Sequence, residues 1–125
     1  MKENVLLDLS KEFAKEIIFL CREIKVRKTE YTVTNQLLRS GTSIGANIHE
    51  AQYAQSKNDF VSKFEIALKE CYESEYWLEL LFETDSIDEQ KYAKMKNDCG
   101  KIRRLLIASC KTIKENIGIR TQPNN

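Results

Sequence analysis

The sequence predicts a single all-α domain, folded as an antiparallel up-down-up-down four-helix bundle over residues 1–125. Apolar residues recur at alternating steps of three and four in four long segments, and only a few residues link one segment to the next. No stretch shows the alternation of apolar and polar residues that indicates a strand. With 125 residues, 42% of them hydrophobic, and a single Pro, the chain is long enough to bury one core.

The first two helices are expected at about 8–26 and 33–54. Asp8 or Ser10 is a suitable cap for the first helix, and Thr32 or Thr34 for the second. The apolar stripe of the first helix consists of Phe13, Ile17, Leu20 and Ile24, and that of the second consists of Leu37, Gly41, Ile44, Ile48 and Ala51.

The last two helices are expected at about 57–83 and 87–117, followed by a loose tail over 119–125. Ser56 with Asp59 resembles a capping box, and Ser86 with Glu89 matches one fully. Gly118 is the expected C-terminal cap. The predicted stripes are Phe60, Phe64, Ala67, Cys71, Ser74, Leu78 and Leu81 in the third helix, and Tyr92, Met95, Cys99, Ile102, Leu106, Ser109 and Ile113 in the fourth.

Two glycines stand four residues apart inside the second predicted helix. Gly41 and Gly45 each cost about 1 kcal/mol of helix propensity relative to alanine. Residues four apart share a helix face, so the pair would allow a neighbouring backbone to approach closely, within the monomer or across a subunit contact. A kink is the alternative.

The third helix carries more apolar surface than one core stripe can bury. Tyr72, Tyr76, Trp77 and Leu80 lie off its core register, and Ile66 shares one side of the helix with Trp77 and Leu80. Such side chains either expose only their polar tips, as amphipathic aromatics do, or form a patch that an oligomer buries. We favour the oligomer.

Charge is segregated between the last two helices. Residues 65–89 contain nine acids and one base, whereas residues 91–120 contain nine bases and two acids, although the net charge of the chain is only +1. The two helices could simply complement each other. Alternatively, the basic helix binds a phosphate backbone or an acidic protein. On a helical wheel its bases spread over the whole polar arc, which weakens the second interpretation.

No constellation of residues indicates catalysis. The only histidine, His49, is adjacent to Glu50 in sequence, so the two point about 100° apart on a helix and do not form an acid–base pair. Glu-x-x-His motifs, zinc spacings and Gly-rich phosphate loops are absent from the sequence. We expect no cofactor and no enzymatic activity. A site built from carboxylates such as Glu50 and Glu70 is the weakest alternative.

The four cysteines are dispersed and fall in apolar-periodic stretches, which favours buried thiols over disulfides. The N-terminal residues do not form a signal peptide, and no stretch approaches the roughly 20 apolar residues that span a bilayer. A cytoplasmic protein without membrane contact is therefore expected.

One run of residues resembles a known family. Residues 36–52 read QLLRSGTSIGANIHEAQ, and they are followed by AQSKNDF at 54–60, IALKE at 66–70 and YWL at 76–78. In order and spacing these pieces resemble the bacterial four-helix bundle family named for 23S rRNA intervening sequences. That name reflects the location of some of its genes and does not establish a ribosomal role.

The resemblance implies a homopentamer. It also implies a distant relationship to the accessory protein of diversity-generating retroelements, a pentamer with a basic surface that associates with a reverse transcriptase and nucleic acid. Polar positions of the family motif, together with two apolar residues of the third helix, are then expected at an oligomer or binding interface: Arg39, Ser43, Asn47, Glu50, Glu70, Trp77 and Leu80.

These observations favour a non-enzymatic oligomeric scaffold or adaptor that binds RNA, DNA or a nucleoprotein. Its expected nucleic-acid-binding residues are Lys94, Lys101, Arg104 and Lys111. The alternative is a protein–protein interaction module with no nucleic-acid role.

Overall fold

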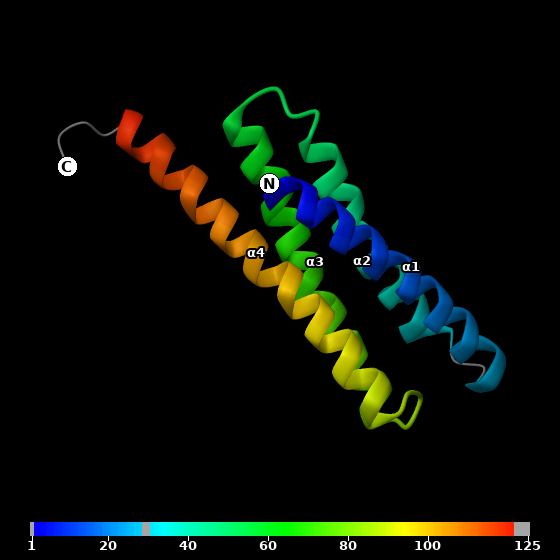
Figure 1. Cartoon of the computed structure of the whole chain (residues 1–125). Helices are drawn as coiled ribbons and strands as arrows, with labels where there is room; N and C mark the ends of the chain where they lie inside the picture. The colour runs from blue at the N-terminus through cyan, green and yellow to red at the C-terminus, as the bar shows by residue number, and fades with distance from the viewer. Residues whose placement is uncertain (1, 29–30, 122–125) are drawn as a thin grey trace.

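The protein is a bundle of four helices that pack in chain order (Figure 1). The computed structural model describes residues 2–28 and 31–121. Its helices are α1 (Lys2–Lys28), α2 (Thr32–Ala51), α3 (Lys57–Glu83) and α4 (Glu89–Thr121). α1 packs on α2, α2 on α3 and α3 on α4, and a less extensive contact between α1 and α4 closes the bundle. The predicted fold class is confirmed.

Cross-helix contacts show that neighbouring helices are antiparallel. Ser10 lies against Gly45 and Ile17 against Gly41 between α1 and α2, so the residue numbers rise in one helix as they fall in the other. The same holds between α3 and α4, where Glu75 pairs with Arg103 and Glu65 with Lys114. Toward its C-terminal end α4 diverges from the other three helices (Figure 1).

The core follows the predicted stripes closely. The fully buried large side chains include Leu6, Phe13, Ile17, Ile24, Leu37, Ile44, Ile48, Phe64, Leu78, Leu81, Met95, Ile102 and Leu106. Phe60, Tyr92 and Ile113, which were expected in the stripes, are only partly buried at the edges of this core. All four cysteines are buried and free, as expected.

The close approach predicted at the two glycines is confirmed within the monomer. A Cβ at Gly41 would lie 3.0 Å from Cγ1 of Ile17, and a Cβ at Gly45 would lie 3.3 Å from the backbone oxygen of Ser10. Both glycines therefore allow α1 to pack tightly on α2, which offsets their poor helix propensity.

Several predicted helix ends are wrong. α1 begins at Lys2, not near residue 8, because Leu6 and Ser10 extend the buried stripe by one turn. Ser10 is therefore inside the helix, and its hydroxyl donates to the backbone oxygen of Leu7. At the start of α2 neither predicted threonine is the cap, since Tyr31 occupies that position without a side-chain hydrogen bond.

The C-terminal ends of α2 and α4 also differ from the prediction. α2 ends at Ala51, because the next three amides donate to carbonyls three residues earlier and tighten the chain out of the α-helix. In α4 the backbone stays helical past Gly118 to Thr121, so this glycine is not a cap. Residues 122–125 of the predicted tail lie outside the described residues.

Of the two predicted capping boxes, only the first is confirmed. The Ser56 hydroxyl accepts from the amide of Asp59 at 3.0 Å. At α4 the cap is Asp88, whose carboxylate accepts from the amide of Lys91 at 2.7 Å, whereas Ser86 is buried in the preceding turn. That turn is a Schellman motif in which Asp85 adopts the left-handed conformation (φ 60°) that glycine usually takes.

Candidate nucleic-acid interface and oligomer surface

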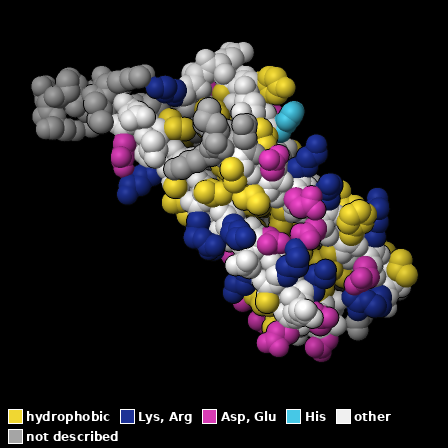
Figure 2. Space-filling model, viewed as in Figure 1, with side chains coloured by type: hydrophobic (Ala, Val, Ile, Leu, Met, Phe, Trp, Pro, Cys, Tyr) yellow, Lys and Arg dark blue, Asp and Glu magenta, His cyan; other side chains and the backbone are white. Residues whose placement is uncertain are grey.

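The outer face of α4 carries three exposed bases in one row. Lys101, Arg104 and Lys111 follow helical spacings of three and seven residues, so they lie along one side of the helix over about 15 Å. Within the described residues no carboxylate forms an ion pair with any of them. Figure 2 shows Lys and Arg side chains over the surface that α4 forms. This row is a surface with uncompensated positive charge.

Lys94, the fourth predicted nucleic-acid-binding residue, is held by carboxylates. Its Nζ lies 2.7 Å from Glu16 of α1 and 2.8 Å from Asp98 of α4. Hydrogen bonds to Asp98 and Glu16 raise the pKa of Lys94, so its charge is kept but locally compensated. Its side chain links α1 to α4, so unlike Lys101, Arg104 and Lys111 it is paired with acids.

Other bases of α4 face α3 and complement its acids. Nε of Arg103 donates to Glu75 at 2.7 Å, and Lys114 pairs with Glu65. The charge segregation seen in the sequence thus has two parts. Some bases stabilise the contact between the helices, as the complementarity hypothesis predicts, while the row at Lys101, Arg104 and Lys111 is left facing solvent.

A groove between the C-terminal end of α3 and α4 was not predicted from the sequence. It has a volume of about 470 Å³ and is lined by Phe82, Glu89, Tyr92, Ala93, Lys96, Asn97, Gly100, Arg103 and Arg104. Within it, Tyr92 stacks on Phe82 with parallel rings 4.6 Å apart. Because its residues lie on two helices, only the tertiary structure reveals it.

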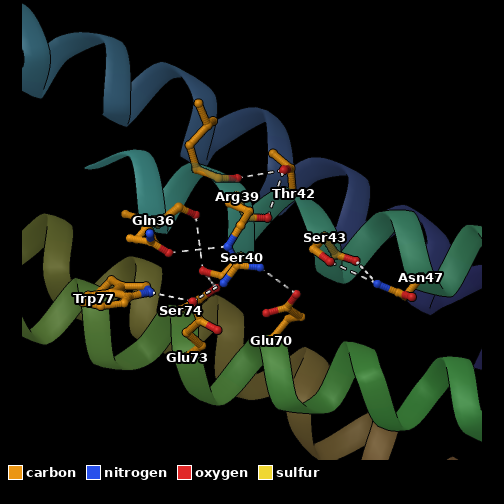
Figure 3. Close-up of polar contacts among 12 residues, drawn as sticks. Gln36, Arg39, Ser40, Thr42, Ser43, Asn47, Glu70, Glu73, Ser74 and Trp77 are labelled. Atoms are coloured by element: carbon orange, nitrogen blue, oxygen red, sulfur yellow. Dashed lines mark hydrogen bonds and ion pairs between the residues drawn. The ribbon is translucent and has the colours of Figure 1, made fainter. Parts of the chain in front are cut away.

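The polar motif residues of α2 meet acids of α3 on another face of the bundle (Figure 3). Arg39 binds Glu70 at 3.1 Å through Nη1 and Glu73 through Nη2. Nε1 of Trp77 donates to the same Glu73 carboxylate at 2.9 Å. The hydrogen bond from Trp77 is the main cause that lowers the pKa of Glu73, and Arg39 lowers it further. The structure therefore brings Arg39, Glu70 and Trp77 into one network, to which Glu73 is central.

The remaining motif residues make local contacts along the same side of α2. Asn47 donates to the backbone oxygen of Ser43 at 2.9 Å and to its hydroxyl at 3.0 Å. Glu50 pairs with Lys63 of α3 at 3.1 Å. Glu50 thus reaches across to α3, whereas Ser43 and Asn47 bond to each other within α2.

The outer face of α3 exposes the apolar residues that the sequence singled out. Ile66 is 41% exposed, Tyr72 52% and Tyr76 54%. Trp77 and Leu80 are less exposed, at intermediate burial. Part of the Trp77 side chain packs against the core, and its ring contacts the ring of Tyr76 edge-on. The patch formed by Ile66, Tyr76, Trp77 and Leu80 has the composition of an interface core, rich in aromatic residues.

Among the described residues, no group of three or more His, Cys, Asp or Glu side chains is placed to hold a metal ion. His49 is exposed and makes an edge contact with the ring of Tyr53. Glu50 and Glu70, the carboxylates considered for catalysis, each bind a different base. Along the described part of the chain, no helix is long and apolar enough to cross a membrane.

Comparison with known proteins agrees with the motif and the fold. The sequence profile described as "23S rRNA-intervening sequence protein" matches residues 2–108. The chain belongs to this family. A crystal structure of a protein of unknown function, from the S23 ribosomal protein family of Bacteroides thetaiotaomicron VPI-5482, is similar with a TM-score of 0.87 and 50% identity, over 89% of this chain and 99% of that one. None of the curated proteins matches.

Proposed function

We propose that this member of the family is a non-enzymatic oligomeric scaffold or adaptor that binds nucleic acid or a nucleoprotein through the outer face of α4. The row of Lys101, Arg104 and Lys111 carries the proposal. Seven other bases of the described chain are bound to carboxylates. These three are set apart because they are exposed, form no ion pair and lie together on one side of one helix. Phosphate backbones are bound by such rows of bases.

The experiment is a titration of labelled RNA and DNA at several salt concentrations. The variant Lys101→Ala/Arg104→Ala/Lys111→Ala removes the row. A matched control, Lys11→Ala/Lys57→Ala/Lys69→Ala, removes three exposed lysines elsewhere and changes the net charge equally. Affinity falls as salt rises, and we expect the first variant to make the slope of log affinity against log salt shallower by about 2 to 3, which is one unit or slightly less per lost phosphate contact. The control keeps most of the slope.

Two results would contradict the proposal. Wild-type protein that binds neither RNA nor DNA at low salt lacks the activity altogether. Equal loss of affinity in both triple variants would show that binding follows net charge and does not use the row on α4.

We further propose that the patch of Ile66, Tyr76, Trp77 and Leu80 is buried between copies of the chain. Its support is the exposure of large apolar side chains beside the network of Arg39, Glu70 and Glu73. The resemblance to the family implies five copies. Light scattering should give five times the mass of one chain, and Ile66→Lys/Tyr76→Lys should lower it. A wild-type mass of one chain at micromolar concentration would refute the oligomer.

A protein-interaction module without nucleic acid is the second candidate, and the same α3 patch favours it. In that case a host protein binds the patch, and its binding survives nuclease treatment and is lost in Ile66→Lys/Tyr76→Lys. If the Lys101→Ala/Arg104→Ala/Lys111→Ala variant loses the partner and nuclease releases it, this alternative fails.

A further inference from the structure

The groove beside α4 combines guanidinium and ammonium cations with an aromatic stack. It lies next to the row of bases described above, since Arg104 belongs to both. The groove is therefore positioned to receive part of any strand that the row binds.

The missing side chain of Gly100 lets the guanidinium groups of Arg103 and Arg104 both lie close to position 100 on α4. A Cβ at position 100 would be 3.1 Å from Nη1 of Arg104 and 3.5 Å from Nη2 of Arg103. Arg103 is compensated by Glu75, but no carboxylate of the described residues forms an ion pair with Arg104. Two like charges brought together, with one uncompensated, form a site that an anion would stabilise.

The aromatic stack lies two turns before Gly100 on the same helix. One face of the Tyr92 ring packs on Phe82, and Nζ of Lys96 lies 5.6 Å from the centroid of the same ring. Lys96 is exposed and its long side chain is free to rotate, so it can leave the ring for a phosphate. The ring of Tyr92 would then offer a surface on which a base can stack.

We propose that this groove binds single-stranded nucleic acid, with one phosphate at Arg103 and Arg104 over Gly100 and one base stacked on Tyr92. The inference rests on the proposed function and gives its ligand a definite form. A base paired in a duplex cannot reach a half-buried ring in a groove, whereas an unpaired base can rotate into it. Glu89, the acid in the groove, lies at the far end from Gly100 and so favours the phosphate at the glycine.

The central test uses Gly100→Ala, a change that adds one methyl group and removes no charge. Alanine should raise the melting temperature, because it is the better helix former. At the same time its methyl group displaces Arg104, so affinity for a labelled oligothymidylate should fall roughly three- to tenfold. Higher stability together with weaker binding is a combination that a purely structural role of Gly100 does not produce.

Tyr92→Leu tests the stacking surface, and we expect it to weaken binding of the single strand roughly five- to tenfold. Tyr92→Phe removes only the hydroxyl, keeps the ring on Phe82 and should keep the affinity. Tyr53→Leu, the same change at an exposed tyrosine outside the groove, should have no effect. Anisotropy with the oligothymidylate and with a duplex of equal length is the assay.

The outcomes separate this inference from the proposed function. If wild-type protein binds neither probe at low salt, both fail. If it binds, but Gly100→Ala and Tyr92→Leu match wild type, the groove is not a site, while the row of bases stands. If both variants weaken the duplex as much as the single strand, the groove does not select unpaired bases and the inference is overturned.

Discussion

The buried hydroxyl pair between α2 and α3 allows a quantitative test of what fixes the register of these helices. Ser40 and Ser74 are both fully buried, and their hydroxyl oxygens lie 2.8 Å apart (Figure 3). No buried side-chain nitrogen or oxygen among the described residues lacks a hydrogen-bond partner, and these two hydroxyls satisfy each other. A different register would separate them inside the core, where each would lose its partner.

Replacing one serine should cost more than replacing both. Ser40→Ala or Ser74→Ala leaves the other hydroxyl buried without this partner, at a cost of about 1 to 2 kcal/mol in the free energy of unfolding. The double variant removes both hydroxyls and leaves two small apolar side chains, so its cost should be near or below that of either single variant. The expected coupling energy is therefore about 1 kcal/mol or more.

Chemical denaturation of the four proteins, at one fixed protein concentration, measures this coupling. The concentration must be held constant because an oligomer would add its own contribution to the apparent stability. Purely additive effects, with coupling below about 0.3 kcal/mol, would refute the role of the pair. That result would mean that the serines bond to their own helix carbonyls, as Ser40 also does to Leu37 at 3.4 Å.

Three further predictions follow from local geometry. Trp77 fluorescence should change as Glu73 is protonated, because the Trp77 ring donates a hydrogen bond to this carboxylate. The pKa of Glu73 is lowered from 4.5, so the stability contributed by its ionised form is present above pH 4.5 and is lost as the pH falls through the lower pKa of the folded state. Glu73→Gln should abolish the titration, and a midpoint above 4.5 would contradict the assignment. Asp85→Gly should raise stability by up to about 1 kcal/mol, because glycine adopts φ 60° without steric cost; no gain in thermal denaturation would count against strain at this turn. In the native protein Cys21 should react slowly with thiol reagents at neutral pH, since burial raises the pKa of its thiol to about 11. Cys99 should react more slowly still, because its hydrogen bond with Cys71 and its burial both raise the pKa of its thiol. Unfolding in denaturant should expose every thiol, whereas fast labelling of Cys99 in the native protein would contradict its burial.

The recurrence of apolar residues was sufficient to predict the fold class and most of the core. Ile17, Leu37, Phe64 and Ile102 all occupy the interior positions that their spacing indicates. Helix ends were harder to predict, because serine and threonine are good caps in isolation but are also small enough to be buried. Ser10 and Ser86 were expected as caps and instead lie in buried positions.

The candidate sites, too, could be predicted from the sequence only in part. The basic character of α4 and the apolar excess of α3 were visible from composition along one helix. Which bases stay uncompensated was not, because ion pairs such as Lys94 with Glu16 join residues 78 positions apart. The groove at Tyr92 and the network centred on Glu73 likewise require two helices to be placed side by side.

By itself, the sequence determined four amphipathic helices, their antiparallel order and their family, because helical periodicity, short links and motif spacing are local properties of the chain. Only the tertiary structure decided which polar groups meet. Packing selects one rotation and one register for each helix, and this choice left Lys101, Arg104 and Lys111 exposed while it bound Arg39 and Lys94 to carboxylates. The physical reason is that the core fixes the helices through nonlocal contacts, and the surface charges are then paired or left unpaired according to where the core has placed them.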